Sequence, residues 1–298
     1  MRVAVSSATV VVAVMGLLFM GPTVRASIID FESTQAAHPN LLHHWTFEGA
    51  SVATALEDKK GAGSLAGTGT LNLISGFGGS GQAMQFPTGD NYARSTTYPG
   101  GASWVNQATV QFLIRPTADV SGVAVGVVAD HVSGGMNRFD FAQNGTDSFT
   151  WVRGDLAFKP VFGTGTSVAL TLGNWYYVAL QYEYYDSGGG DMKFRLNSWV
   201  LDLTANPSGG TLAHTLNNEI VNSSSTGATL SNRGLGFAVH PATITTGWDG
   251  ELDAVAIYNT TLSSATLQEH VDVIPEPTAG LLFALAGLLL GLLRRRRL

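Results

Sequence analysis

Apolar and polar residues alternate in short bursts along the middle of this chain. Val110, Phe112 and Ile114 fall on one face of an extended segment, and the same alternation recurs in residues 192–197 and 235–239. A side-chain period of two is typical of a half-buried β-strand. Clusters of turn-forming residues separate the bursts, at 76–81, 187–191 and 206–210. The chain therefore predicts many short strands, arranged as a sandwich or a barrel.

These segments fit one domain. Residues 41–272 contain all the alternating segments, and residues 27–40 precede them as a short leader. A chain of this length can bury a sufficient core as a single unit. No repeat of fixed period is visible, which argues against a propeller or a β-helix.

One segment has helical spacing instead of alternation. Ser263 or Ser264 is a suitable N-cap, and Leu267 and Val271 lie four residues apart on one face. We therefore expect a short helix over residues 263–271, at the C-terminal end of the domain.

The N-terminus has the pattern of an export signal. Arg2 opens an uncharged run over residues 3–20, and Val24 and Ala26 occupy the two positions that a signal peptidase reads. Residues 1–26 are therefore predicted to be a signal peptide that is cleaved after Ala26. The alternative is an uncleaved anchor, and both interpretations export the middle of the chain.

The C-terminus combines a proline-flanked turn, an apolar run and a basic end. Its charged and proline positions are Pro275, Glu276, Pro277, Arg294, Arg295, Arg296 and Arg297. The prolines interrupt helix and sheet. The uncharged residues 278–293 would span roughly 24 Å as a helix, against a hydrocarbon core of roughly 30 Å, and snorkelling arginines can close the gap. We predict a single transmembrane helix with a cytoplasmic basic end; the alternative is a buried core helix.

Taken in this order, the parts of residues 273–298 resemble the PEP-CTERM sorting signal of Gram-negative bacteria. The resemblance implies recognition by an exosortase, a membrane transpeptidase-like enzyme, in organisms that make extracellular polysaccharide. The expected path is anchoring in the inner membrane during sorting, followed by display on the cell surface or in the extracellular matrix.

Composition excludes several classes of function. The chain has no cysteine, which removes disulfides, thiol chemistry and cysteine-ligated zinc. Without Arg2, Arg25 and the four terminal arginines, ten of the 16 basic residues remain against 22 acidic ones, a net charge of −12. Such a domain repels nucleic acid. The charge is compatible with a calcium site or a neutral polysaccharide partner and selects neither.

Five sequence blocks together resemble the laminin G-like, concanavalin A-like jelly roll. They occupy residues 42–48, 81–92, 112–116, 175–179 and 250–262. The resemblance implies an all-β fold of two antiparallel sheets packed face to face. The chain departs from the family pattern at residues 57–61, where a second glycine-rich turn bearing an aspartate is common.

The same superfamily includes glycoside hydrolases, which would place an active site in the last strand. Retaining glycosidases pair two carboxylates about 5 to 5.5 Å apart. The strand offers Glu251 and Asp253, but Val255 and Ala256 occupy both positions where the second glutamate could stand. We therefore predict no catalytic residue and no enzymatic activity; a glycoside hydrolase is the alternative.

The histidines do not suggest a metal centre or a catalytic triad. His43 and His44 are adjacent, so on a strand they point to opposite faces and cannot share one metal ion. His131, His214 and His240 show no zinc or triad spacing. Hydrogen-bonded surface histidines are the preferred interpretation.

Calcium is the cofactor that the aspartates could hold. Asp90 lies in a turn, where side-chain and carbonyl oxygens can gather. Asp253 falls, by period two, on the same face as Val255 and Ile257, where a carboxylate needs an arginine, turn N–H groups or an ion as partner. A hydrogen-bonding role is preferred for Asp253, with calcium as the alternative.

Several aromatic residues beside turns are candidates for stacking on sugar rings. They are Trp104, Trp151, Trp199, Trp248 and Tyr185. At least half of them are expected to fill the core or an edge instead, and Trp45 and Trp175 are assigned to the core. The resulting hypothesis is an exported binding or adhesion module for carbohydrate. A structural matrix component without a discrete ligand is the chief alternative.

Overall fold

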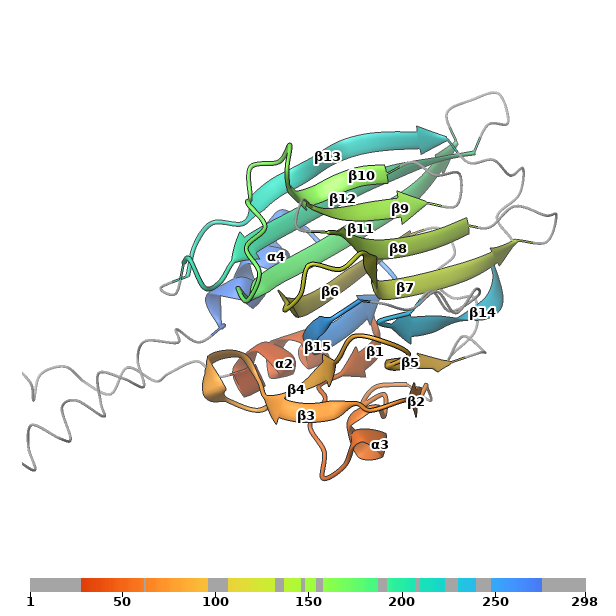
Figure 1. Ribbon diagram of the computed structural model, residues 1–298. Helices are drawn as coiled ribbons and strands as arrows, with labels where there is room; N and C mark the ends of the chain where they lie inside the picture. Colours follow the sequence, from red (N-terminus) through yellow and green to blue (C-terminus); the bar gives the residue numbers. More distant parts are fainter. Residues whose placement is uncertain are drawn as a thin grey trace, which may run out of the picture.

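The computed structural model shows two antiparallel β-sheets packed face to face (Figure 1). It describes residues 28–61, 63–95, 107–131, 137–145, 148–153, 158–186, 192–206, 209–222, 230–239 and 248–274. The predicted signal peptide (1–26), the sorting motif and the predicted membrane helix (278–293) lie outside these residues. In the part of the chain that is described, no helix is long and apolar enough to cross a bilayer.

Sheet A contains eight of the described strands. Its order is β13 (Ala213–Asn222), β12 (Met192–Asp202), β11 (Tyr176–Asp186), β6 (Gln107–Pro116), β15 (Gly250–Tyr258), β4 (Gln82–Phe86) and β3 (Asn72–Ser75). The eighth strand, β1 (Leu41–Trp45), also pairs with β15.

Sheet B contains seven of the described strands. Its order is β10 (Phe158–Gly163), β9 (Ser148–Arg153), β8 (Asn137–Asn144), β7 (Gly122–His131), β14 (Leu230–Phe237), β5 (Tyr92–Ser95) and β2 (Ala66–Thr68). Four helical segments join the strands: α2 (Ile28–Ala37), α3 (Val52–Ala55), the 3₁₀ turn η1 (Phe77–Gly79) and α4 (Ser264–Asp272).

The main core lies between the two sheets and follows the predicted alternation. Val110, Phe112 and Ile114 face inward from sheet A, while Leu235 and Phe237 face inward from sheet B. Further along sheet B, Phe141, Phe149 and Phe162 stack with centroids 4.7 and 4.8 Å apart for successive pairs. Phe162 also joins the two layers, because its ring lies 4.6 Å from that of Tyr176 in sheet A. The prediction of an all-β, two-sheet sandwich is confirmed.

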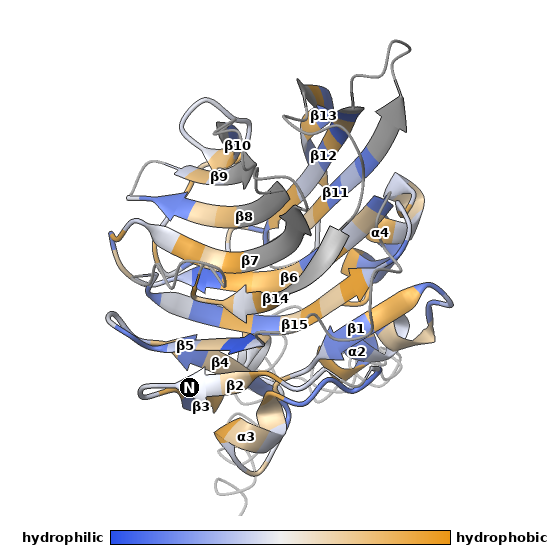
Figure 2. Ribbon diagram, turned by 90° about the vertical axis from the view of Figure 1, so that its right-hand side faces the viewer, coloured by the Kyte–Doolittle hydropathy of each residue, from blue (hydrophilic) through white to orange (hydrophobic). Residues whose placement is uncertain are grey.

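A second core covers the outer face of sheet A. Ile28 and Phe31 of α2 are fully buried, as are Leu267 and, with 1% exposed, Val271 of α4. Figure 2 shows these two helices on the side of the molecule opposite to sheet B. The predicted capped helix is confirmed, because the Ser263 hydroxyl accepts from the Thr266 N–H at 3.0 Å. Residues 27–40, expected as a leader, include a helix that packs against the sheet.

Strand β15 pairs with two strands, β4 and β1, along the same edge. Residues 250–252 pair with β4, whereas residues 255–258 pair with β1. At this seam the register shifts, and Ala254 adopts a left-handed φ of +47°. The bulge places Asp253 and Ala254 on the helix-covered side, while Leu252 and Val255 face the main core. The prediction that Asp253 shares a face with Val255 is therefore wrong, since one extra residue inverts the alternation.

Candidate functional site

Two of the proposed sugar-stacking tryptophans are packed away from solvent. Trp248 has 0% exposure, and its Nε1–H donates to Gln143 Oε1 at 3.0 Å. Trp199 has 7% exposure and stacks on the His214 ring at 4.5 Å. Neither presents a free ring face to a ligand, so both candidates are corrected. Trp45 and Trp175 are buried, as expected for core residues.

The remaining candidates differ in how much of each the structure describes. Trp104 falls outside the described residues. The backbone of Trp151 lies opposite Phe141 in sheet B, and that of Tyr185 lies opposite Lys193 in sheet A; their side chains fall outside the description. Asp90 is exposed in the turn between β4 and β5.

Glu251, the carboxylate proposed for a glycosidase pair, forms an ion pair within sheet A. Its Oε2 lies 3.1 Å from Nη1 of Arg115, the residue opposite it in register. Burial raises the pKa of Glu251, and the Arg115 guanidinium opposes that rise. This geometry explains Glu251 as the partner of a cross-strand arginine.

Asp253 lies at the seam of β15 and is completely buried. Its Oδ2 accepts from the Phe77 N–H at 3.4 Å, whereas its Oδ1 has no hydrogen-bond partner. Burial raises the pKa of Asp253 well above its usual range, and the carboxyls of Glu32 and Glu48 add to the rise. The Phe77 N–H is therefore one of the turn N–H partners expected for a carboxylate at Asp253. It bonds only Oδ2.

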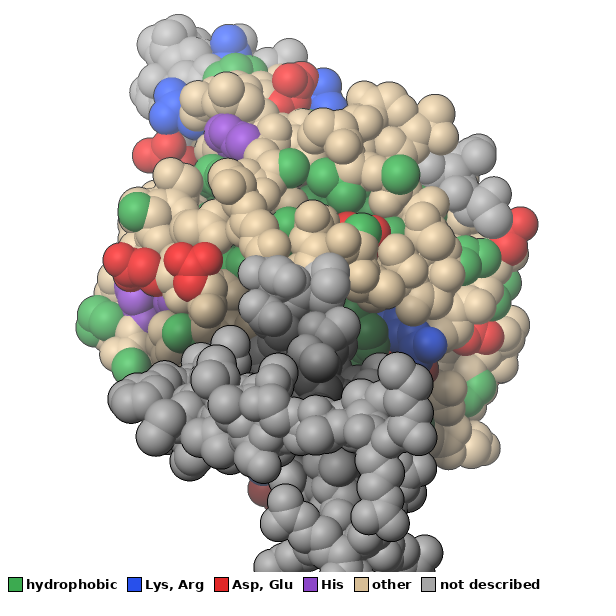
Figure 3. All heavy atoms as spheres, turned by 90° about the vertical axis from the view of Figure 1, so that its left-hand side faces the viewer, with side chains coloured by type: hydrophobic (Ala, Val, Ile, Leu, Met, Phe, Trp, Pro, Cys, Tyr) green, Lys and Arg blue, Asp and Glu red, His purple; other side chains and the backbone are tan. Residues whose placement is uncertain are grey.

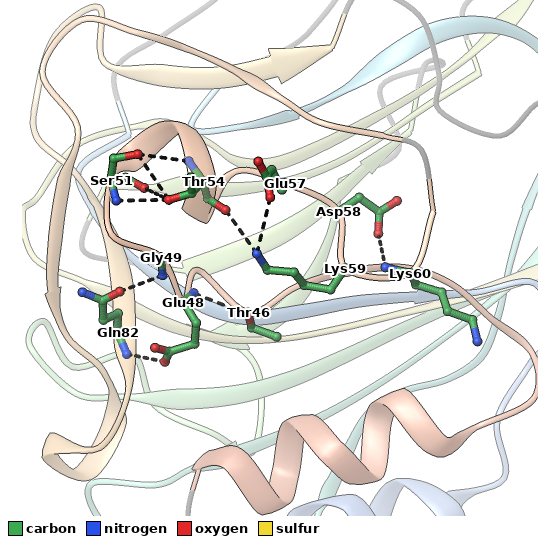
Figure 4. A network of polar contacts seen from close by, with 10 residues as sticks. All are labelled: Thr46, Glu48, Gly49, Ser51, Thr54, Glu57, Asp58, Lys59, Lys60 and Gln82. Atoms are coloured by element: carbon green, nitrogen blue, oxygen red, sulfur yellow. Dashed lines mark hydrogen bonds and ion pairs between the residues drawn. The ribbon is translucent and has the colours of Figure 1, made fainter.

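Two further carboxyls converge on this seam from separate segments. Glu32 of α2 has 8% exposure, and its Oε1 has no hydrogen-bond partner. Burial raises the pKa of Glu32 to about 8, with Glu48 as the second cause. Glu48 follows β1, and its Oε1 accepts from the Gln82 N–H at 2.6 Å. Figure 4 shows how Gln82 ties this loop to the start of β4.

Glycines permit the close approach of these carboxyls. The turn over residues 76–81 closes with a hydrogen bond from the Gly76 N–H to the Gly81 carbonyl at 3.1 Å. A Cβ on Gly76 would lie 2.7 Å from Asp253 Oδ2, and one on Gly81 would collide with Glu48 Oε1. Gly81 also has a φ of +67°, which side chains disfavour. The glycine-rich composition of this turn is therefore a requirement of the acidic site.

Buried histidines and glutamines continue the polar layer beneath the helices. His44 Nε2 lies 3.1 Å from Gln35 Oε1, and Gln35 Nε2 donates to the Ala254 carbonyl at 3.2 Å. Burial lowers the pKa of His44 to about 4. His43 turns the other way and bonds Asp58 at 2.6 Å, so the predicted opposite orientation is confirmed. No three His, Asp or Glu side chains of the described residues gather closely enough to hold a metal ion by themselves.

The outer face of sheet B carries a different feature, which the sequence reading missed. One row of cross-strand partners crosses six strands: Ala66, Arg94, Gly236, Gly126, Asp140 and Val152. Because Leu235 and Phe237 face the core, Gly236 and its partners occupy the opposite face. We call these positions the glycine row. Its signal in the sequence was a glycine inside each of two alternating segments.

Arg94 borders the glycines with a defined side-chain position. Its Cζ lies 5.6 Å from the centroid of the Tyr92 ring, within the range of a cation–π contact. By contrast, large hydrophobic side chains are scarce on the described surface: Ile29 and Ile220 are the exposed ones. The face in Figure 3 likewise shows hydrophobic groups only in small, separate patches. The described surface thus favours polar over hydrophobic recognition.

Comparisons with known proteins identify the fold. No family model and no curated protein matches the chain. Domain 4 of AbnA, a GH43 extracellular arabinanase from Geobacillus stearothermophilus solved with arabinotriose, is 16% identical, with a TM-score of 0.49 over 78% of this chain and 98% of that one. Trypanosoma rangeli sialidase with sialic acid is 11% identical, with a TM-score of 0.50 over 82% of this chain.

The match covers only 37% of the sialidase chain. The receptor-binding domain of botulinum neurotoxin type G is 10% identical, with a TM-score of 0.46 over 78% of this chain and 51% of that one. At these identities the similarity establishes a shared jelly-roll-like fold.

The sequence prediction that the domain is not an enzyme is corrected by these comparisons. The matched sialidase, with a TM-score of 0.50, is a glycoside hydrolase. Sialidases use a tyrosine nucleophile instead of two paired carboxylates. The residues Val255 and Ala256 at the positions of a second glutamate therefore do not exclude hydrolysis, because that strand motif is not a general requirement.

The raised pKa of Glu32 predicts a pH-dependent stability in the presence of chelator. Folded wild-type protein keeps the Glu32 proton up to about pH 8, whereas the unfolded chain loses it near 4.5. The wild-type contribution is therefore present at low pH and is lost as pH rises through this window. Relative to wild type, Glu32→Gln should gain unfolding free energy between pH 5 and pH 8, measured by urea denaturation.

The matched control is Glu57→Gln, which removes a carboxyl that is more than half exposed. Its difference from wild type should stay the same at both pH values. An equally constant difference for Glu32→Gln would contradict the buried, proton-retaining environment of Glu32.

Proposed function

We propose that this protein is an exported cell-surface or matrix protein whose sandwich binds carbohydrate through the outer face of sheet B. The observation that carries the proposal is the contrast between the two outer faces. Helices α2 and α4 bury that of sheet A, whereas the middle of sheet B carries the glycine row and no described helix (Figure 2).

The chemistry of the glycine row suits a sugar. Glycines inside strands leave the backbone without a covering side chain, and Gly236 is itself buried among its neighbours. Next to them, Arg94 and Asp140 stand at the register positions on either side of the glycine pair. The Arg94 guanidinium provides donors for the hydroxyls of a sugar. An arginine beside two glycines of neighbouring strands therefore supports a polyhydroxylated ligand.

The comparisons support the same class of ligand. The sialidase chain, which shares the fold, was solved with sialic acid. The expected charge of −12 for the processed chain favours a neutral polysaccharide over an acidic one.

Export and sorting complete the proposal. Residues 1–26 would direct secretion, and residues 273–298 would hold the chain in the inner membrane, where an exosortase recognises the Pro-Glu-Pro motif. The domain would then present its ligand face outside the cell, at the surface or in the matrix.

Retention on the host's extracellular polysaccharide tests the ligand face. Full-length wild-type protein should be retained, and Arg94→Ala and Gly236→Val should each reduce retention at least about tenfold, which corresponds to about 1.4 kcal/mol. Arg195→Ala is the matched control, because Arg195 pairs with Glu183 in sheet A. Released reducing sugar, measured in the same samples, reports hydrolysis.

Equal retention of all four proteins would contradict the assignment of the ligand to this face. No retention of the wild type would favour a structural matrix component. Circular dichroism of each variant would show that the sandwich is intact.

Cell fractionation tests the sorting proposal. Replacing Pro275 and Pro277 with alanine should leave the chain in the inner-membrane fraction at full mass, because the exosortase motif is lost. Replacing Pro87 and Pro160 with alanine is the control and should not change the location. Unchanged surface display of the Pro275 and Pro277 variant would contradict the sorting assignment.

A further inference from the structure

We propose that the α-ammonium group of Ser27, which signal-peptide cleavage creates, forms an ion pair with the buried carboxylate of Glu32. The proposal rests on the export part of the proposed function, in which the chain is cut after Ala26. It is independent of the glycine row and of carbohydrate binding. Processing would thereby supply a positive charge that the uncut chain lacks at this place.

Glu32 is a buried acid, and one of its oxygens has no partner. It lies in α2 with 8% exposure, and its Oε1 accepts no hydrogen bond. Buried polar atoms are almost always bonded, because an unpaired one loses its contact with water without replacement. Among the described residues, the ion pairs of lysine, arginine and histidine involve other carboxylates. The described part of the chain thus gives Glu32 no cation.

Helix geometry directs this carboxyl towards the start of α2. Side chains of an α-helix tilt towards its N-terminus, and residues four positions apart lie one above the other on the same face. Glu32 follows Ile28, the first residue of α2, by four positions, and both are buried together with Phe31 and Gln35. The Glu32 side chain therefore points along the buried face at the first turn of the helix.

Ile28 is fixed in place at that turn. It has 0% exposure, and its Cγ2 lies 2.8 Å from the point that a Cβ on Gly81 would occupy. Glu48 Oε1 approaches the same point closely. A second carboxyl group therefore borders the start of α2, and a positive charge there would be attracted by both acids.

Covalent geometry brings the new amino group to the same turn. Ser27 lies outside the described residues, but one peptide bond joins it to Ile28, so its nitrogen is no more than about 5 Å from the Ile28 Cα. In the uncut chain this nitrogen is a neutral amide, and the pKa of about 8 for Glu32 belongs to that chain. After cleavage it is an amine with an ordinary pKa of about 8.

Each of the two groups needs the other once the chain is cut. The positive end of the helix dipole disfavours an ammonium group at the start of α2, unless a carboxylate neutralises it. The Glu32 carboxylate in turn is disfavoured by burial, unless a cation pairs with it. A charge-assisted hydrogen bond from the ammonium group would satisfy the free Oε1 and remove both penalties.

The pair gives processing a structural role. Helix α2 also carries Gln35, whose Nε2 donates to the Ala254 carbonyl at the seam of β15. Fastening the first turn of α2 therefore stabilises the seam together with the second core. The cover over sheet A would be complete only in the exported protein.

Periodate oxidation of the mature protein, purified after export, tests the pair. Periodate converts an N-terminal serine to a glyoxylyl group, which removes the ammonium group and leaves lysine intact. Mass spectrometry establishes the N-terminus and the conversion. At pH 7, oxidation should lower the Tm of the wild type by about 4 °C or more, because it leaves the buried carboxylate without its cation. Oxidation should not lower the Tm of Glu32→Gln.

Glu57→Gln is the matched control, because Glu57 is exposed beside Lys59, and it should lose as much as the wild type. The pKa of the Ser27 amino group, followed by NMR, gives a test without any variant and should lie above its ordinary value. A chain that starts at Ser27 and keeps its Tm after oxidation would overturn the pair alone, as would an equal loss in Glu32→Gln. A mature chain that starts at another residue would overturn the pair together with the predicted cleavage.

Discussion

The pairing of β15 is the interaction on which the rest of this structure depends. All nine of its residues, 250–258, are buried. One edge pairs with β6 on both sides of the bulge, and the other is shared by β4 and β1. A strand with two successive partners on one edge must have a seam between them. The bulge at Asp253 and Ala254 forms that seam and decides which side chains face which core.

The seam explains why polar groups accumulate beneath the helices. Where the pairing changes partner, backbone groups lose their regular ladder, and the Ala254 carbonyl takes its hydrogen bond from Gln35 of α2 instead. Helix α2 therefore completes the sheet as well as covering it. In turn, because sheet A is covered, the outer face of sheet B is the face on which we propose recognition. Fold and function are linked through this one strand.

Much of the fold could be predicted from sequence because alternation is a local property. The core faces of β6 and β14 and the cap of α4 followed directly from spacing. The bulge could not be predicted, since Ala254 shows no sign in the sequence of its left-handed φ. The same limitation placed Asp253 on the wrong face. Helix α2 was missed because its burial depends on a sheet formed by distant segments.

The candidate sites were harder to predict for a related reason. A tryptophan beside a turn has the same local sequence pattern whether it is exposed or buried. Trp248 is buried and hydrogen-bonded to Gln143. The glycine row depends on register between β7 and β14, which are about a hundred residues apart in sequence. The non-enzyme prediction failed because it tested a single strand motif, while sialidases, one of which shares this fold over 37% of its chain, use a tyrosine nucleophile instead of two paired carboxylates.

Hydrogen–deuterium exchange of the full chain, with and without the extracellular polysaccharide, tests the central claim most directly. Carbohydrate binding at the glycine row predicts protection in peptides from β7, β8 and β14, with α2 and α4 unchanged. Protection confined to α2 and α4, or no protection at saturating polysaccharide, would contradict the account.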